Sequence, residues 1–162
     1  MGTRGLFRFL AVLCLLSAFA LRATADSSAI AQGAKADGSA VLVENAWARA
    51  TVEGQEGTGA YLEITAVRDA RLVGVTSPLA REGQVHEMKS EGGRMTMRRI
   101  DALELPAGRK IALAPGHQHI MLLGLSRQVL PGERLPLVLE IEWKDGKRSR
   151  VPVSAEVRPL RQ

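Results

Sequence analysis

From residue 41 onward the chain consists of short segments in which apolar and polar residues alternate, a pattern that predicts β-strands. Side chains of a strand point alternately to its two faces, so each segment has one apolar face to bury. Gly, Pro and Asp residues separate the segments, and Asp145-Gly146 between two of them predicts a hairpin. The nine expected strands are residues 41–49, 59–66, 70–76, 84–89, 94–99, 109–114, 118–124, 134–143 and 148–154.

Many short strands at this spacing are typical of a Greek-key β-sandwich, and no amphipathic helical stretch of a dozen residues competes with them. The chain has 162 residues, a length that suits one domain. We therefore predict an all-β fold, a single Greek-key β-sandwich domain over residues 41–155, followed by a tail of residues 156–162.

Residues 1–25 have the pattern of a secretory signal peptide. Arg4 and Arg8 precede an apolar run over residues 9–21, and Ala23-Thr24-Ala25 supplies the small residues of a cleavage site. The run is shorter than the roughly 18 residues expected of a membrane span. We expect these residues to be removed on export, leaving a Gly/Ala/Ser-rich flexible segment at 26–40 and no membrane span.

Removal of residues 1–25 changes the composition that bears on function. It leaves 19 Lys and Arg against 17 Asp and Glu, a net charge of +2 in place of +5. Nucleic-acid binding is disfavoured, because this charge is small and only Trp47, Tyr61 and Trp143 remain to stack on bases.

The single cysteine, Cys14, lies within the apolar run of the signal and follows Leu13, which makes it a poor site for lipid attachment. A mature chain without cysteine excludes disulfides, cysteine nucleophiles, cysteine-based zinc sites and blue-copper sites.

Every histidine and methionine of residues 26–162 falls within a window of 36 residues, between positions 86 and 121. Within it they recur two residues apart, so each group projects from one face of its expected strand. The groups are His86 with Met88, Met95 with Met97, and His117 with His119 and Met121. Three such groups on successive strands can converge on one place.

Imidazole and thioether are neutral ligands, and thioether sulfur is soft, a combination that selects Cu(I) over Zn, Mg, Ca or Mn. One methionine in a strand usually fills the core, and one histidine near a turn is usually solvated or hydrogen-bonded. The joint pattern, and not any single residue, favours a metal site.

Four of these residues, His86, Met97, His119 and Met121, have the spacing H-x10-M-x21-H-x-M. The chain thereby resembles the periplasmic copper chaperone family called PCu(A)C. The matching segments are residues 46–50 (AWARA), 59–62 (GAYL), 85–87 (VHE), 95–98 (MTMR), 105–108 (LPAG), 115–116 (PG), 119–122 (HIML), 124–125 (GL) and 151–153 (VPV). The resemblance covers roughly residues 41–155.

The resemblance implies a cupredoxin-like β-sandwich in the periplasm that binds one Cu(I) through those four side chains at a shallow, partly exposed site. It implies that the protein carries copper toward cytochrome c oxidase, particularly its dinuclear copper centre, with Sco-type proteins as partners. We expect a monomer. His117 replaces a second glycine of the family pattern, and His117, Met88 and Met95 are candidate auxiliary ligands. The C-terminus RPLRQ lacks the His/Met-rich tail of some relatives.

Three other functions compete with this one. A structural β-sandwich would bury the histidines and methionines as packing, and a copper scavenging or resistance protein would have the same site with another destination. A hydrolytic metalloenzyme would need a general base beside the metal. Glu87 follows His86 on a strand and should point to the opposite face, so we predict that the protein is not an enzyme.

Overall fold

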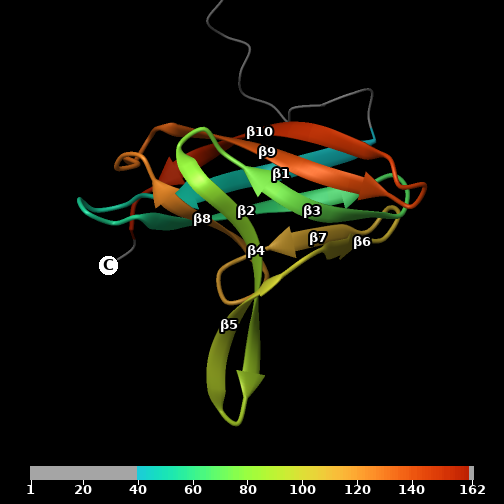
Figure 1. The fold of residues 1–162 in the computed structure, drawn as a ribbon, viewed down its shortest axis with the longest axis horizontal. Helices are drawn as coiled ribbons and strands as arrows, with labels where there is room; N and C mark the ends of the chain where they lie inside the picture. The colour runs from blue at the N-terminus through green and yellow to red at the C-terminus, as the bar shows by residue number, and fades with distance from the viewer. Residues whose placement is uncertain (1–39, 161–162) are drawn as a thin grey trace, which may run out of the picture. The chain divides into compact units, whose positions relative to one another are not determined.

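The computed structural model describes residues 40–160, and all regular structure in this range is β-strand (Figure 1). The burial of β9 and β10 alternates residue by residue, as expected for strands with one face toward a core. The ten strands are β1 (Val41–Arg49), β2 (Gly57–Ala66), β3 (Ala70–Thr76), β4 (Ala80–Glu91), β5 (Arg94–Ile100), β6 (Leu103–Leu105), β7 (Lys110–Leu113), β8 (His119–Leu125), β9 (Arg134–Trp143) and β10 (Arg148–Arg158).

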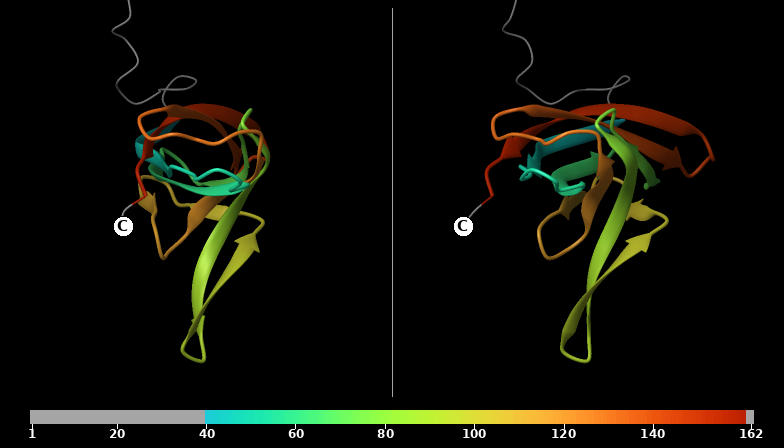
Figure 2. Two further views of the ribbon diagram at one scale, coloured as in Figure 1. Left: turned by 90° about the vertical axis from the view of Figure 1, so that its left-hand side faces the viewer. Right: turned by 60° about the vertical axis from the view of Figure 1, so that its left-hand side comes forward.

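Seven strands form a closed, flattened sheet, which we call the sandwich. Their order is β4-β8-β2-β1-β10-β9-β3, and β3 returns to β4 through the pair Val75 and Gly83. β1 and β10 are parallel, and the other pairs are antiparallel. Figure 2 shows the strands as two layers about a common interior. β6 and β7 add to β3 and β2, respectively.

The interior is a single aliphatic core. Its side chains come from both layers, and the largest of them are at most 2 % exposed: Leu62, Ile64, Leu72, Leu105, Ile120, Leu122, Val129, Leu135, Leu137, Leu139, Ile141 and Val157. Their burial is the main driving force for folding of this domain.

The β4–β5 hairpin projects away from the sandwich (Figures 1 and 2). β4 pairs with β8 as far as His86, and beyond that residue it pairs only with β5. Gly92 and Gly93 join the two strands, and both have positive φ (58° and 79°), as a two-residue type I′ turn requires. This turn sets the register that places Met88 directly opposite Met97.

The predicted all-β sandwich is confirmed. The strands expected at 41–49, 70–76 and 134–143 have these bounds, and β9 and β10 form the predicted hairpin around Asp145-Gly146. For these strands, the alternation of apolar and polar residues between turn residues was sufficient to predict the bounds.

The other six predicted strands differ in their bounds, four of them by only one or two residues at an end, and one strand was not predicted. β4 is twice as long as the expected 84–89, because it pairs first with β8 and then with β5. β10 continues to Arg158, because its end pairs with β1, so residues 156–158 belong to the sheet and not to a tail. β6 was not predicted, since three residues are too few to show alternation. The expected signal peptide, most of the flexible segment and Cys14 lie outside the described residues.

Candidate metal centre

His86 and His119 are direct neighbours across β4 and β8, at the point where the hairpin leaves the sandwich. Both are buried, with 9 % and 8 % of their surface exposed. Their ring centroids lie 5.8 Å apart, and the ring planes meet at 66°. We call these two residues the inner pair. The structure therefore brings together two histidines that are 33 positions apart in the sequence.

A hydrogen bond determines which nitrogen of His119 is free. Its Nδ1 lies 3.0 Å from the carbonyl oxygen of His117, and because a carbonyl only accepts, Nδ1 carries the proton and donates it. The other ring nitrogen, Nε2, is left with its lone pair and lies 3.2 Å from the sulfur of Met97.

The local sequence explains why the His117 carbonyl is available. The amide of His117 donates to the carbonyl of Ala114 across Pro115-Gly116, and Gly116 has a φ of 81°. Proline followed by a residue with positive φ is the pattern of a type II turn. His117 itself is exposed, and its carbonyl, not its imidazole, contacts the inner pair.

Hydrogen bonds between side chains also determine which ring nitrogen of His86 is free. The Glu82 carboxylate accepts from the amide nitrogen of Gln84 (2.8 Å), so Oε1 of Gln84 faces His86 and accepts from its Nε2 (2.6 Å). Nδ1 of His86 is then unprotonated. It is the only buried side-chain nitrogen or oxygen in residues 40–160 without a hydrogen-bond partner. An orphaned acceptor beside a second free imidazole nitrogen is the arrangement expected of two metal ligands.

The two methionines of the predicted site are held differently. Met97 is 51 % exposed on the hairpin and reaches His119 with its sulfur. Met121 is partly buried, two residues after His119 on the same face of β8, between Gln84 of β4 and Gly59 of β2. The structure thus places contacts among His86, His119 and Met97, and places Met121 next to them in the sheet.

Met88 and Met95, the other candidate ligands, lie farther out on the hairpin. Met88 is opposite Met97, and Met95 is two residues from Met97 on the same face of β5. They continue the row of donors away from the inner pair.

An aromatic wall adjoins His119, and the sequence analysis did not assign it to the site. The rings of Tyr61 and His119 are 6.2 Å apart, and those of Trp47 and Tyr61 are 4.3 Å apart. Both aromatic residues come from neighbouring strands, β2 and β1. Alternation alone places them on a strand face, but only the register of β2 against β8 brings them beside a histidine.

The electrostatic environment favours neutral imidazole at His86. Burial lowers the pKa of His86 below its usual value, and its neighbours His119 and Arg99 add to this effect by disfavouring a second positive charge beside them. Neutral imidazole is the form that binds a metal.

Glu87 lies on the other face of β4, where its carboxylate accepts from Arg98 (2.6 Å) and pairs with Lys89 (3.5 Å). These contacts lower the pKa of Glu87, chiefly through the Arg98 hydrogen bond. A carboxylate held in this way does not face the inner pair as a general base would.

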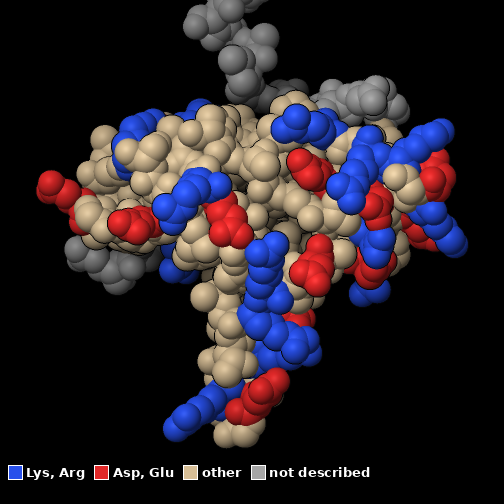
Figure 3. All heavy atoms as spheres, in the orientation of Figure 1, with Lys and Arg blue, Asp and Glu red and all other residues tan. Residues whose placement is uncertain are grey.

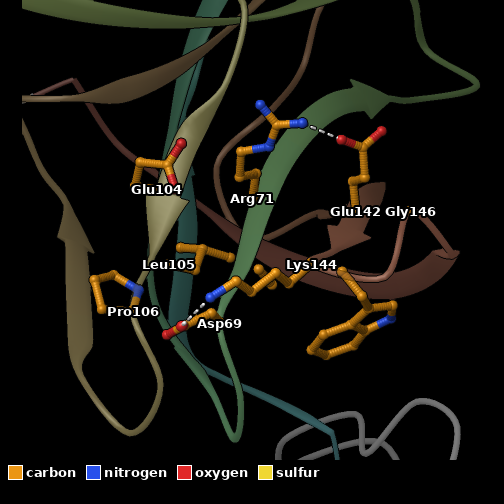
Figure 4. Close-up of a pocket in the computed structure, with 10 residues that line it drawn as sticks. Asp69, Arg71, Glu104, Leu105, Pro106, Glu142, Lys144 and Gly146 are labelled. Carbon is orange, nitrogen blue, oxygen red and sulfur yellow. Dashed lines mark hydrogen bonds and ion pairs between the residues drawn. The ribbon is translucent and has the colours of Figure 1, made fainter.

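A groove lies elsewhere on the domain, between β3, β6 and β9, with a volume of about 630 Å³ (Figure 4). Its floor contains Leu105, Pro106 and Trp143, and no histidine or methionine lines it. Two ion pairs line it, Arg71 with Glu142 and Lys144 with Asp69. This groove is therefore separate from the candidate centre.

Residues 40–160 contain no group of three or more His, Cys, Asp or Glu side chains placed to hold a metal. The donors of another type beside the inner pair include the thioethers of Met97 and Met121. Within the same range there is no helix of the length and apolarity needed to cross a membrane.

Comparison with known proteins identifies the family. The family described as "Putative lipoprotein LpqE-like" matches residues 41–156. The chain belongs to this LpqE-like family. It is also 35 % identical over 128 residues to "Putative lipoprotein Lxx21020" of Leifsonia xyli subsp. xyli (strain CTCB07), covering 78 % of this chain and 75 % of that protein.

Solved structures similar to this LpqE-like protein include PCuAC domains. The copper-bound PCuAC domain from PmoF2 matches with a TM-score of 0.60 and 29 % identity, over 75 % of this chain and 94 % of that one. Apo-DR1885 from Deinococcus radiodurans matches with a TM-score of 0.53 and 26 % identity, over 91 % of this chain and 97 % of that one. The Cu(I) form of DR1885 matches with a TM-score of 0.54 and 28 % identity, over 72 % of this chain and 76 % of that one.

These matches confirm the resemblance to the PCu(A)C family and the cupredoxin-like fold that it implied.

Proposed function

We propose that this LpqE-like protein is a copper chaperone that binds one Cu(I) through His86, Met97, His119 and Met121. One observation carries the proposal: two buried imidazoles each have one nitrogen occupied by a hydrogen bond and the other free, with a thioether sulfur against one of them. The free atoms are Nδ1 of His86 and Nε2 of His119.

The donor set suits Cu(I) in particular. Two imidazoles and two thioethers are all neutral, and soft sulfur ligands favour Cu(I) over the harder divalent ions. Gln84 and the His117 carbonyl fix the ring tautomers, as outer contacts of metal-binding histidines usually do. The copper-bound PCuAC domain from PmoF2 and the Cu(I) form of DR1885 support the choice of metal.

The same geometry suits release of the ion. Met97 is half exposed, so ligands of a recipient can replace it without opening the core. Transfer then proceeds by exchange of one neutral ligand for another, and the copper stays Cu(I) throughout. The described residues include no thiolate, the ligand on which electron-transfer cupredoxins depend.

The proposed destination is the copper centre of cytochrome c oxidase, with Sco-type proteins as partners, as the family resemblance implies. A copper scavenging or resistance role is the alternative, since it would use the same site. Transfer of Cu(I) from the loaded protein to the isolated copper-binding domain of the oxidase separates them. Oxidase assembly predicts transfer to that domain, whereas scavenging predicts retention.

The proposed location is the periplasm, after cleavage of residues 1–25. The relatives named as lipoproteins offer lipid attachment as the competing outcome. Mass spectrometry of the protein from its native host distinguishes the two. An N-terminus near Asp26 supports cleavage, and a lipid-modified Cys14 would contradict it.

X-ray absorption of the Cu(I)-loaded protein tests the ligand set. We expect two nitrogen and two sulfur scatterers in the wild type. One sulfur should disappear in Met97→Leu and one nitrogen in His119→Ala. Coordination by nitrogen and oxygen alone would overturn the assignment of the methionines.

A further inference from the structure

The methionines of the β4–β5 hairpin are more exposed than apolar packing explains. Met95 is 57 % exposed and Met97 is 51 % exposed, on a part of β5 whose only sheet neighbour is β4. Methionine in a strand usually fills the core. Here the hairpin projects away from the sandwich (Figure 1), so these side chains have no core to fill.

The three methionines of the hairpin, the exposed Met95 and Met97 and the partly buried Met88, share one face. Met88 is directly opposite Met97, and Met95 lies on the diagonal from Met88. Opposite residues in an antiparallel pair have Cβ atoms about 4.5–5.5 Å apart, and diagonal neighbours about 7–8 Å, within reach of long side chains. Three flexible thioethers can therefore meet at one point. We call Met88, Met95 and Met97 the outer cluster.

The other face of the hairpin is charged. It carries Glu87, which pairs with both Lys89 and Arg98, and also Arg94. Figure 3 shows Lys and Arg side chains gathered along one side of the projecting hairpin and uncharged side chains along the other. The charged face presents ion pairs to solvent, but it leaves the methionine face unexplained.

We propose that the outer cluster is a second binding site for a soft monovalent metal ion, through which Cu(I) passes to and from the inner pair. The inference rests on the proposed function. Met97 connects the two sites, because its sulfur lies 3.2 Å from Nε2 of His119 while its strand neighbour is Met88.

The transfer step requires only ligand exchange. Cu(I) held by the sulfurs of Met88, Met95 and Met97 keeps Met97, exchanges Met88 and Met95 for the two free imidazole nitrogens, and gains Met121. Each exchange replaces one neutral donor by another, and no electron or proton is transferred. A site of thioethers alone favours Cu(I) over Zn(II) or Cu(II).

The two sites should respond differently to pH. Protonation removes imidazole as a ligand, whereas a thioether does not titrate in the accessible range. The outer cluster should therefore retain Cu(I) at a pH where the inner pair no longer does. No arrangement in which methionines merely pack would produce this difference.

Methionine-methyl NMR under anaerobic conditions tests the proposal. The protein, residues 26–162, is labelled with ¹³C at its four methionine methyl groups and titrated with Cu(I) supplied as a weak complex. We expect the first equivalent to shift Met97 and Met121, and the second to shift Met88 and Met95. At pH 5 we expect the signals of Met88 and Met95 to respond and that of Met121 to respond weakly.

The matched variants are Met88→Leu/Met95→Leu, which keeps the apolar surface but removes the sulfurs, and Thr96→Val on the charged face. We expect the double variant to lose the second equivalent and Thr96→Val to keep it. Unmoved Met88 and Met95 signals at two equivalents, with Met97 and Met121 shifted by the first, would overturn the outer cluster alone. If no methionine signal moves, the proposed function fails as well.

The rate of copper transfer provides a second readout. If the face is instead a docking surface for a partner protein, the double leucine variant should deliver Cu(I) as fast as the wild type, because leucine preserves the apolar area. Such a result would also overturn the outer cluster. Slower transfer to a small-molecule chelator, which has no protein surface, would support it.

Discussion

The sandwich and the β4–β5 hairpin hold the candidate ligands in contrasting ways. The inner pair is buried in the closed sheet, and each ring is oriented by a hydrogen bond. Met97 is half exposed on a two-stranded projection without further sheet partners. Nitrogen donors are thus fixed in advance, whereas a sulfur donor can move.

This contrast explains how one site can both hold and release an ion. Fixed ligands lose little freedom on binding, which favours affinity. A ligand on a projecting hairpin can be displaced without disturbing the core, which favours exchange.

The largest difference is expected in folding stability. Leu139→Ala should lower the free energy of unfolding by about 2–5 kcal/mol, because it opens a cavity in the core. Met95→Ala should change it by less than about 0.5 kcal/mol, as expected of an exposed position. Denaturant unfolding measures both. Equal losses would mean that the hairpin is part of the cooperative core.

The next difference is in Cu(I) affinity. His86→Ala or His119→Ala should weaken binding by more than about 100-fold, since removing even an outer contact of a metal ligand costs about 10–100-fold. Met97→Leu should weaken Cu(I) binding less than either histidine substitution, and Met88→Ala should weaken it less than Met97→Leu. Competition with a chromophoric chelator measures each affinity. Similar losses at His86, His119 and Met88 would contradict the ligand assignment.

A smaller effect is expected from the residue that orients His86. Gln84→Leu removes the acceptor for Nε2 and should weaken Cu(I) binding about 10-fold. Gln84→Glu keeps an acceptor and should preserve more affinity, while its negative charge moves the loss of binding to higher pH. Thr96→Val serves as the control. No difference between the two Gln84 variants would show that the hydrogen bond does not act on the metal.

The smallest effect concerns pH. Because burial and nearby positive charge lower the pKa of His86, its imidazole stays neutral below the usual titration range near pH 6.5. Cu(I) affinity should therefore persist as the pH falls through about 6.5 and decline only as the pH approaches the lowered pKa of His86.

The stability of the metal-free fold should follow the same direction. The unfolded chain binds a proton at His86 more readily than the folded chain, because the pKa of His86 is lowered by folding. The contribution of neutral His86 to the free energy of unfolding is therefore complete above about pH 6.5, and it is lost as the pH falls from there through the lowered pKa. NMR titration of the His86 ring measures the pKa directly. A value above that of a free histidine would contradict the account.

The sequence was informative wherever function and fold depend on local pattern. Alternation predicted β1, β3 and β9 with their observed bounds, and the Gly92-Gly93 turn fixes the hairpin register from within the chain. Spacing by two residues also predicted that His119 and Met121 share a face, because that geometry belongs to a single strand.

Contacts between distant strands could not be predicted in this way. The pairing of His86 with His119 depends on the register of β4 against β8, and the approach of Tyr61 depends on that of β2. The role of Gln84 follows from two hydrogen bonds that exist only in the folded chain. Such features arise from tertiary structure, and a single sequence contains no local signal for them.

The central claim is that His86, Met97, His119 and Met121 bind one Cu(I). The most direct test is anaerobic titration of residues 26–162 with Cu(I) against a competing chromophoric chelator, beside the double variant His119→Ala/Met121→Ala. We predict one tight equivalent in the wild type that is lost in the variant. No tight binding, or binding that the two substitutions leave unchanged, would contradict the claim.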